Sequence, residues 1–295
     1  MTFKYQHQGS ILIEMLVACV LIAIFLPLLV VASTRLQERH RLAQAYQDQF
    51  EIKAAIEAHF QAQWARLVPA NCYPDDTALL TIGSGMSPPV RLASRKVAES
   101  SDWIKGTDYG LCRRSLTVHE NPLEVSMACH WRVGDPVVFS SCNAGFSGQL
   151  TYVNSRGNRS RIAFDDEDVI GQSGVIESQN GFYWYLSPGK DGREAFWRTP
   201  AESGNSLELF NGIERVAIFA LLDENNDGLV DALGASYGDV SLKKLRGLWV
   251  EYQYHLRDCG VQKMTLSMRE YVSMRGETWS YFAPCQGVGN QIIIF

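Results

Sequence analysis

The sequence lacks the motifs that mark most catalytic and nucleic-acid-binding sites. Its 295 residues carry a net charge of −5 and no stripe of Lys and Arg, which argues against a nucleic-acid surface. The short basic run from Leu242 to Arg246 is typical of a solvated turn. His119 and His130 fit no metal-binding motif such as H-E-x-x-H, and no glycine loop of the phosphate-binding kind is present. These absences predict a protein that is not an enzyme and has no nucleic-acid partner.

The C-x-x-C spacing of zinc sites is also missing, although the chain has seven cysteines. Cys19 lies within an apolar run, where it behaves as a small hydrophobic residue. The other six follow that run, and an even number of cysteines in an exported domain suggests disulfides. Many connectivities are open to six cysteines, and the order along the chain is the only guide. That order favours the sequence-local pairs Cys72–Cys112, Cys129–Cys142 and Cys259–Cys285.

A long apolar run is present near the amino terminus. From Ser10 to Ala32 nearly every residue is apolar, which is close to the ~20 residues that a membrane-spanning helix needs. No Ala-x-Ala site ends the run, so a cleaved secretory signal peptide is disfavoured. A plain membrane anchor gives no reason for Glu14, because a carboxylate inside a span is costly and usually marks function. We expect residues 10–32 to cross the membrane.

The residues just before Glu14 account for this charge. The hexapeptide GSILIE, residues 9–14, resembles the processing site of type IV prepilins and of type II secretion pseudopilins. The resemblance implies that a prepilin peptidase cuts after Gly9 and removes residues 1–9 as a leader. Ser10 then becomes the new, N-methylated terminus. Glu14 falls at the fifth position of the mature chain, where the family pairs it with the terminal amine of a neighbouring subunit.

Two features depart from the family pattern. Ser10 replaces the usual phenylalanine, which minor members tolerate. The leader carries only Lys4, whereas Arg35, Arg39 and Arg41 follow the span, so the positive-inside rule does not support a cytoplasmic amino terminus. An orientation in a bacterial inner membrane with the C-terminal domain in the periplasm therefore rests on the resemblance.

Helical periodicity continues after the apolar run, over residues 33–68. Apolar side chains recur mostly at steps of three or four and define one face, with polar side chains opposite. These apolar residues are Leu42, Tyr46, Phe50, Ile56, Phe60, Trp64 and Leu67. Pro69 ends the pattern, and Pro27 is expected to bend or locally unwind the span. One helix from about Ile11 to Leu67 would be ~85 Å long, and its apolar face predicts packing against a sheet, as in pilin folds.

The remaining residues, 69–295, predict one β-rich domain. Short apolar runs, several of them alternating with polar residues as half-buried antiparallel strands do, lie at 115–120, 148–155, 161–166, 181–187, 194–199, 215–222, 247–256 and 263–274. The segment SPGKDG at 187–192 predicts a hairpin connection. The expected fold class is α+β and type IV pilin-like, with a long N-terminal helix, transmembrane in its first half, packed against an antiparallel sheet.

Residues 181–256 narrow the resemblance. The segments here are, in order, a Tyr-rich strand, a turn, GREAFWR, ELFNGIERVAIFALL, an Asp/Asn/Gly loop and GLWVEYQYHL. This order is similar to that in the carboxy-terminal half of PilW-type minor pilins. These are relatives of the J-type pseudopilins, whereas K-type pseudopilins lack the glutamate found here at position 14. Residues 72–168 align with neither. The resemblance implies a minor pilin that helps prime assembly of a type IV pilus and sits at or near its tip. A J-type pseudopilin of a type II secretion system is the alternative.

The resemblance also implies partners and location. Other minor pilins, the major pilin, the prepilin peptidase and the inner membrane are expected partners, and a pilus-tip adhesin is left open. The protein would move from the inner membrane to the pilus at the cell surface. A membrane-tethered, calcium-dependent enzyme or receptor is the hypothesis from a different class, and it predicts that Glu14→Ala is tolerated.

An acidic loop at residues 223–231 is the one candidate metal site. Oxygen-bearing side chains stand at loop positions one, three, five and nine, with Gly228 at position six, where calcium loops need a sharp turn. The candidate ligands are Asp223, Asn225, Asp227 and Asp231, with the backbone carbonyl of Leu229, and Val230 is expected to point inward. Gly234 occupies the place of the bidentate glutamate of an EF-hand. Calcium, bound weakly at ~10⁻⁴–10⁻³ M, is favoured over a metal-free Asn/Asp/Gly turn.

Overall fold

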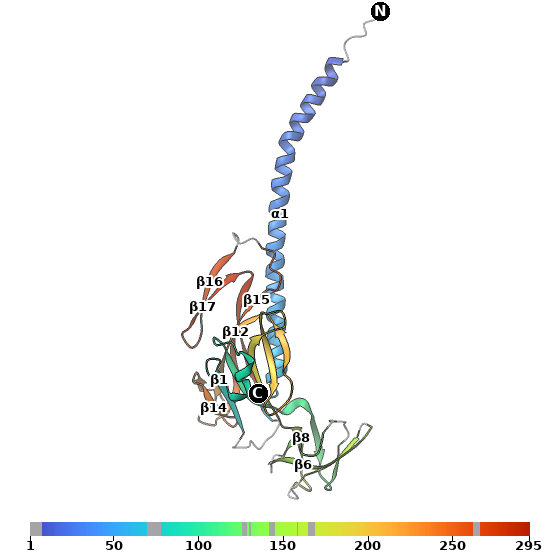
Figure 1. The fold of residues 1–295 in the computed structure, drawn as a ribbon, viewed down its shortest axis with the longest axis vertical. Coiled ribbons are helices and arrows are strands. Elements are labelled where there is room, and N and C mark those ends of the chain that lie inside the picture. The colour runs from blue at the N-terminus through green and yellow to red at the C-terminus, as the bar shows by residue number, and fades with distance from the viewer. Residues whose placement is uncertain are drawn as a thin grey trace, which may run out of the picture.

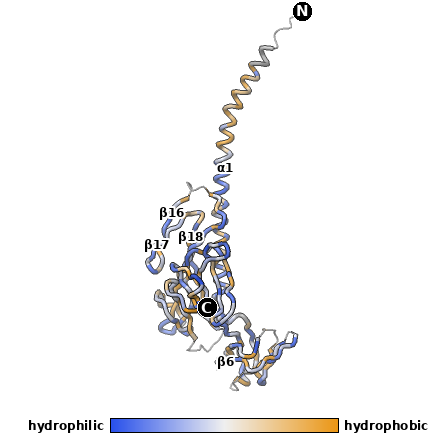
Figure 2. Tube along the Cα trace, in the orientation of Figure 1, coloured by the Kyte–Doolittle hydropathy of each residue, from blue (hydrophilic) through white to orange (hydrophobic). Residues whose placement is uncertain are grey.

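A single helix, α1 (Gln8–Trp64), forms the long stem of the computed structural model of this protein (Figure 1). The structure describes residues 8–69, 78–125, 129, 131–141, 145–157, 159–164, 169–261 and 266–295. The helix has 57 residues, with Pro27 inside it, and it ends three residues before the predicted Leu67. Its most apolar stretch, in orange in Figure 2, is exposed along its length, and by length and composition it could cross a membrane.

The second half of α1 packs against the β-sheets through a narrower face than the sequence predicts. Ile56, Phe60 and Trp64 are completely buried, as expected. Tyr46 and Phe50, by contrast, have exposed fractions of 44% and 74%, so their assignment to the packed face was wrong. At about 100° per residue, Phe50 lies roughly 120° around the helix from Ile56. The sheets therefore cover the helix on one side only, and Phe50 remains in solvent.

Two antiparallel sheets hold this half of α1. The larger has the order β11-β10-β9-β2-β1-β14 and is made of β1 (Leu79–Ser84), β2 (Asp102–Asp108), β9 (Asn180–Pro188), β10 (Glu194–Pro200), β11 (Leu207–Asn211) and β14 (Gly238–Ser241). The smaller has the order β13-β12-β15-β18 and is made of β12 (Ile213–Leu222), β13 (Ala232–Gly234), β15 (Leu245–His255) and β18 (Gln286–Ile294). Side chains from α1 and from both sheets share one core. A short 3-10 helix, η1 (Val90–Arg95), lies between β1 and β2.

The two central strands of the smaller sheet, β12 and β15, are buried on both faces. In β12, Val216 and Ile218 belong to the core beneath α1, whereas Ala217 and Phe219 pack with Trp279 on the opposite side. Trp279 comes from the hairpin of β16 (Ser267–Val272) and β17 (Thr278–Ala283). Because successive side chains of a strand point to opposite faces, the unbroken apolar run of β12 fits a strand between two layers.

A separate module is inserted between β2 and β9. These two strands are direct neighbours, with Asp108 opposite Asn180, and the residues between them leave the larger sheet. After η2 (Tyr109–Leu111) they form a sheet of order β3-β8-β5-β6-β7-β4, seen at the lower right of Figure 1. Its strands are β3 (Arg113–Thr117), β4 (Leu123–Val125), β5 (Pro136–Ser140), β6 (Gly145–Arg156), β7 (Arg159–Phe164) and β8 (Ser173–Ser178). The module has a hydrophobic core of its own, which includes Val118, Phe139 and Ile162. The single β-rich domain expected over 69–295 thus contains a second cored unit.

The strand predictions agree with the structure where the residue pattern was clear. Each predicted strand overlaps an observed one, and the hairpin at 187–192 is confirmed, with Pro188 of β9 opposite Glu194 of β10. The structure also contains strands that were not predicted, notably β1, β2, β5, β8, β17 and β18. The coarse fold class, α+β with a long apolar N-terminal helix and antiparallel sheets, is confirmed.

Candidate functional site

The predicted processing and assembly residues all lie in the first turns of α1. Gly9 and Ser10 are helical, and Glu14 follows one turn later, because four residues span about 6 Å of helix. Residues 1–7 of the predicted leader lie outside the described part of the chain. The Glu14 side chain is exposed, as are its neighbours Ile13 and Met15. A carboxylate is therefore presented on an apolar helix surface, which is a surface that membranes or other proteins cover.

The acidic loop joins β12 to β13, and most of its carboxylate hydrogen bonds are made to amides of the loop itself. The buried Asp223 carboxylate accepts hydrogen bonds from the amides of Asp227 (3.1 Å) and Gly228 (2.8 Å). Asp231 accepts two more, from the amides of Glu224 (3.0 Å) and Asn225 (3.3 Å). Gly228 has φ +90°, a conformation that favours glycine. These bonds are those of an Asx-rich turn, which forms without a metal.

A guanidinium competes with any cation at the first candidate ligand. Arg246 Nη2 lies 2.6 Å from Asp223 Oδ2. Burial raises the pKa of the Asp223 carboxyl, but hydrogen bonds from Gly228 and Arg246 outweigh it, and the pKa falls below its ordinary value. Val230, expected to point inward, is 46% exposed, so that prediction was wrong. Among the described residues no three His, Cys, Asp or Glu side chains are grouped as a metal site. Calcium binding, through Asp223, Asn225, Asp227, Leu229 and Asp231, stays a prediction.

One predicted disulfide is confirmed and two are corrected. Cys259–Cys285 is present, with its Cα atoms 5.4 Å apart. Cys112 pairs with Cys129, at a Cα separation of 5.7 Å, so the pairs Cys72–Cys112 and Cys129–Cys142 were wrong. Cys112 belongs to the core of the inserted module, and Cys129 packs against it. Cys72 and Cys142 lie outside the described residues. The sequence-local guess failed because the module boundary was not visible in the sequence.

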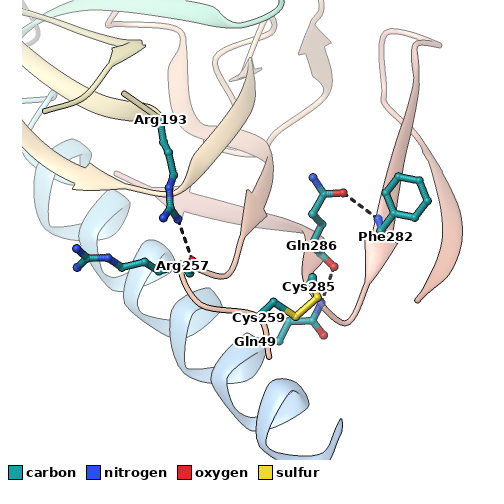
Figure 3. Close-up of a disulfide and its surroundings, with 7 residues drawn as sticks. All are labelled: Gln49, Arg193, Arg257, Cys259, Phe282, Cys285 and Gln286. Atoms are coloured by element: carbon teal, nitrogen blue, oxygen red, sulfur yellow. Dashed lines mark hydrogen bonds between the residues drawn. A yellow bond between two sulfur atoms is a disulfide. The ribbon is translucent and has the colours of Figure 1, made fainter. Parts of the chain in front are cut away.

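The Cys259–Cys285 bridge lies where the C-terminal strands meet α1 (Figure 3). Gln49 of α1 donates through Nε2 to the carbonyl of Gln286 (2.9 Å), and Arg193 Nη1 donates to the carbonyl of Arg257 (3.1 Å). The bridge joins the segment after β15 to the residue before β18. It thus attaches the start of β18 beside Gln49 of α1.

The glutamate of the GIE strand, Glu214, organises the same region. His255 Nδ1 lies 3.2 Å from Glu214 Oε1, and Gln286 and Gln253 donate to the carboxylate at 2.9 Å and 3.1 Å. Gly212, two residues earlier, has φ +91° and accepts a backbone hydrogen bond from His255. The motif that suggested a family thus has a local structural role, which is to join β12, β15 and β18.

Two buried carboxylates tie separate elements together, and nothing in the sequence pattern predicted them. Asp108, at the end of β2, lies 3.0 Å from Arg66 Nη2, just beyond α1, and 3.5 Å from Arg198 Nη1 of β10. Burial raises the pKa of Asp108 despite these two cations. Asp102, at the start of β2, binds Arg275 of the β16–β17 turn through two hydrogen bonds of 2.8 and 2.7 Å. These pairs connect segments about 40 to 170 residues apart, so only the folded chain brings them together.

The chain matches no family model, and comparisons with curated proteins and with solved structures give no significant match.

Proposed function

We propose that the protein is a type IV minor pilin that helps prime pilus assembly and sits at or near the pilus tip. The observation that carries the proposal is the combination of GSILIE at residues 9–14 with the helix that follows it. That helix is one unbroken element whose first part is apolar and exposed and whose second part packs against antiparallel strands. An exposed apolar helix with one carboxylate suits a subunit that leaves a bilayer for a bundle of similar helices.

In this proposal each part of the stem has one task. Cleavage after Gly9 creates the Ser10 amine, which is N-methylated. Glu14 then pairs with the terminal amine of a neighbouring minor or major pilin. In apolar surroundings such a charged pair is strongly directional. Residues 33–64 hold the β-sheets, which stay in the periplasm until the pilus carries them to the cell surface. An adhesin at the pilus tip would bind these sheets.

Mass spectrometry of the mature amino terminus in the native host tests the processing step. We expect a chain that begins at N-methylated Ser10, and we expect the uncut chain to accumulate when the prepilin peptidase gene is deleted. A mature chain that keeps residues 1–9, or one that begins elsewhere, contradicts the proposal.

The assembly step needs a matched pair of variants on the same helix. Glu14→Ala should be processed normally yet reduce surface piliation strongly, because the neighbour's amine loses its partner. Glu38→Ala, which removes an exposed carboxylate beyond the apolar stretch, should leave piliation near the wild-type level. If Glu14→Ala lowers protein secretion and leaves piliation intact, the J-type pseudopilin is the better assignment. If it changes neither, the chain is an ordinary anchored protein.

A further inference from the structure

The inserted module carries a cluster of arginines on the solvent face of its sheet. Tyr152, Asn154 and Arg156 of β6 alternate along the strand and therefore share one face. Arg161 of β7 is directly opposite Asn154, and Arg159 is directly opposite Arg156, so both join that face. Glu124 of β4, opposite Arg161, completes it. These six residues line a cleft of about 390 Å³.

The other face of the same strands fixes this arrangement. Leu123 and Val125 of β4 and Ile162 of β7 are buried in the module core. A register shift of one residue would expose these side chains and bury the arginines, at high cost. The arginine face is thus a fixed surface of the fold.

The charges on this face are not balanced for stability. Arg156 and Arg159 stand directly opposite each other, and like charges in such cross-strand pairs are destabilising. Arg159 lies 2.9 Å from Glu124 and Arg161 lies 3.2 Å from Glu120, but both pairs are exposed, and exposed ion pairs contribute little. Arg156 forms no ion pair with any residue that the structure describes. An anion between the two guanidinium groups would remove the repulsion.

The remaining lining residues indicate what carries the anion. Tyr152 is part-exposed, and its hydroxyl accepts a hydrogen bond from Asn154 Nδ2 (3.1 Å), which orients both side chains. The ring offers an apolar surface beside amide and guanidinium donors, a mixture that fits a sugar ring with a carboxylate group. The cleft volume lies in the range of small-molecule sites, ~300–1,000 Å³. The clustered arginines are confined to this one cleft, and the sequence has no stripe of Lys and Arg of the kind that a nucleic-acid surface carries.

We propose that this cleft binds an acidic polysaccharide, with carboxylates held between Arg156 and Arg159 and a sugar ring against Tyr152. The module lies at the end of the molecule away from the apolar half of α1 (Figure 1), so a long polymer can reach it without meeting the membrane-facing segment. The proposal rests on this surface alone and holds whether or not the chain is a pilin.

Binding to polygalacturonate, a carboxylate polymer, tests the proposal directly. The full-length protein in a non-ionic detergent is titrated against immobilised polygalacturonate at about 0.15 M ionic strength, with neutral dextran as the reference. The double variant Arg156→Gln/Arg159→Gln should bind at least about tenfold more weakly, a loss of about 1.4 kcal/mol or more. The control double variant Arg114→Gln/Arg132→Gln removes two exposed charges from the same module outside the cleft and should stay within about twofold of wild type.

Two further measurements separate binding from folding and from general charge. Removing Arg156 relieves repulsion, so its variants should unfold at the same temperature as wild type or higher, which excludes misfolding as the reason for lost binding. Glu124→Gln frees Arg159 and should tighten binding. The proposal is overturned if wild type does not prefer polygalacturonate to dextran, or if the control variant loses as much affinity. Tighter binding of duplex DNA than of polygalacturonate would overturn it in favour of a nucleic-acid ligand.

Discussion

Two phenylalanines ten residues apart on α1 test how the stem is held by the sheets. Phe60 is completely buried; its ring stacks on Trp64 at a centroid distance of 4.7 Å and meets Phe196 and Tyr252 edge-on at 5.2 and 5.6 Å. Phe50, on the same helix, is 74% exposed. Both changes to alanine remove the same atoms and raise helix propensity alike, so the difference between them reports packing.

The expected magnitudes differ clearly. Phe60→Ala leaves a cavity among aromatic rings and should lower the free energy of unfolding by about 3–5 kcal/mol. Phe50→Ala should change it by less than about 0.5 kcal/mol. Chemical denaturation of the full-length chain in detergent, followed by tryptophan fluorescence, measures both, and the slope with denaturant checks that the same transition is compared. Losses within about 1 kcal/mol of each other would refute the packing scheme of α1.

Three further predictions follow from buried polar groups and the acidic loop. Arg275→Met leaves the Asp102 carboxylate buried without its guanidinium partner and should lower the free energy of unfolding by about 3–5 kcal/mol. We expect faster proteolysis of the β16–β17 hairpin in this variant. The control Arg269→Met, on exposed β16, should not change the cleavage rate. Burial raises the pKa of Glu214, but hydrogen bonds from His255, Gln286 and Gln253 outweigh it, and the pKa falls below its ordinary value of 4.5. The ionised carboxylate therefore stabilises the fold fully at pH values above 4.5. This stabilisation is lost as the pH falls through the lowered pKa of the folded state. The stability lost in Glu214→Gln, measured by urea denaturation, should therefore be largest near neutral pH and shrink towards about pH 3, and a difference that stays constant would contradict this linkage. Calorimetry should detect calcium binding with a dissociation constant of ~10⁻⁴–10⁻³ M in the wild-type protein. Asp227→Asn should abolish this binding, and the control Asp239→Asn should leave it unchanged. If the wild-type protein releases or absorbs no heat, the metal-free turn that Arg246 stabilises is favoured.

The helix and the clearest strands could be predicted because their signals are local. An apolar run, a step of three or four, and proline at position 69 are properties of neighbouring residues, and they define α1 to within about three residues at each end. The strands that were missed lack such a pattern. β18 contains Gly287 and Gly289, against which Tyr254 and Tyr252 pack so closely that an added Cβ would approach them to 2.5 and 2.4 Å. Those glycines weaken the strand signal, and their reason lies in another strand.

The candidate sites also divide into those that the sequence located and those that only the tertiary structure brought together. The sequence alone located residues 9–14, the apolar stretch and the acidic loop, because each is a contiguous motif whose chemistry depends on spacing. Tertiary structure alone decided that Phe50 is exposed, that Cys112 pairs with Cys129, and that Asp102 meets Arg275. It also decided that Arg156 and Arg159 face each other on one side of an inserted sheet. Strand register and the direction of a helix face depend on contacts between residues far apart in the chain. The pattern of residues adjacent in the sequence does not record these contacts.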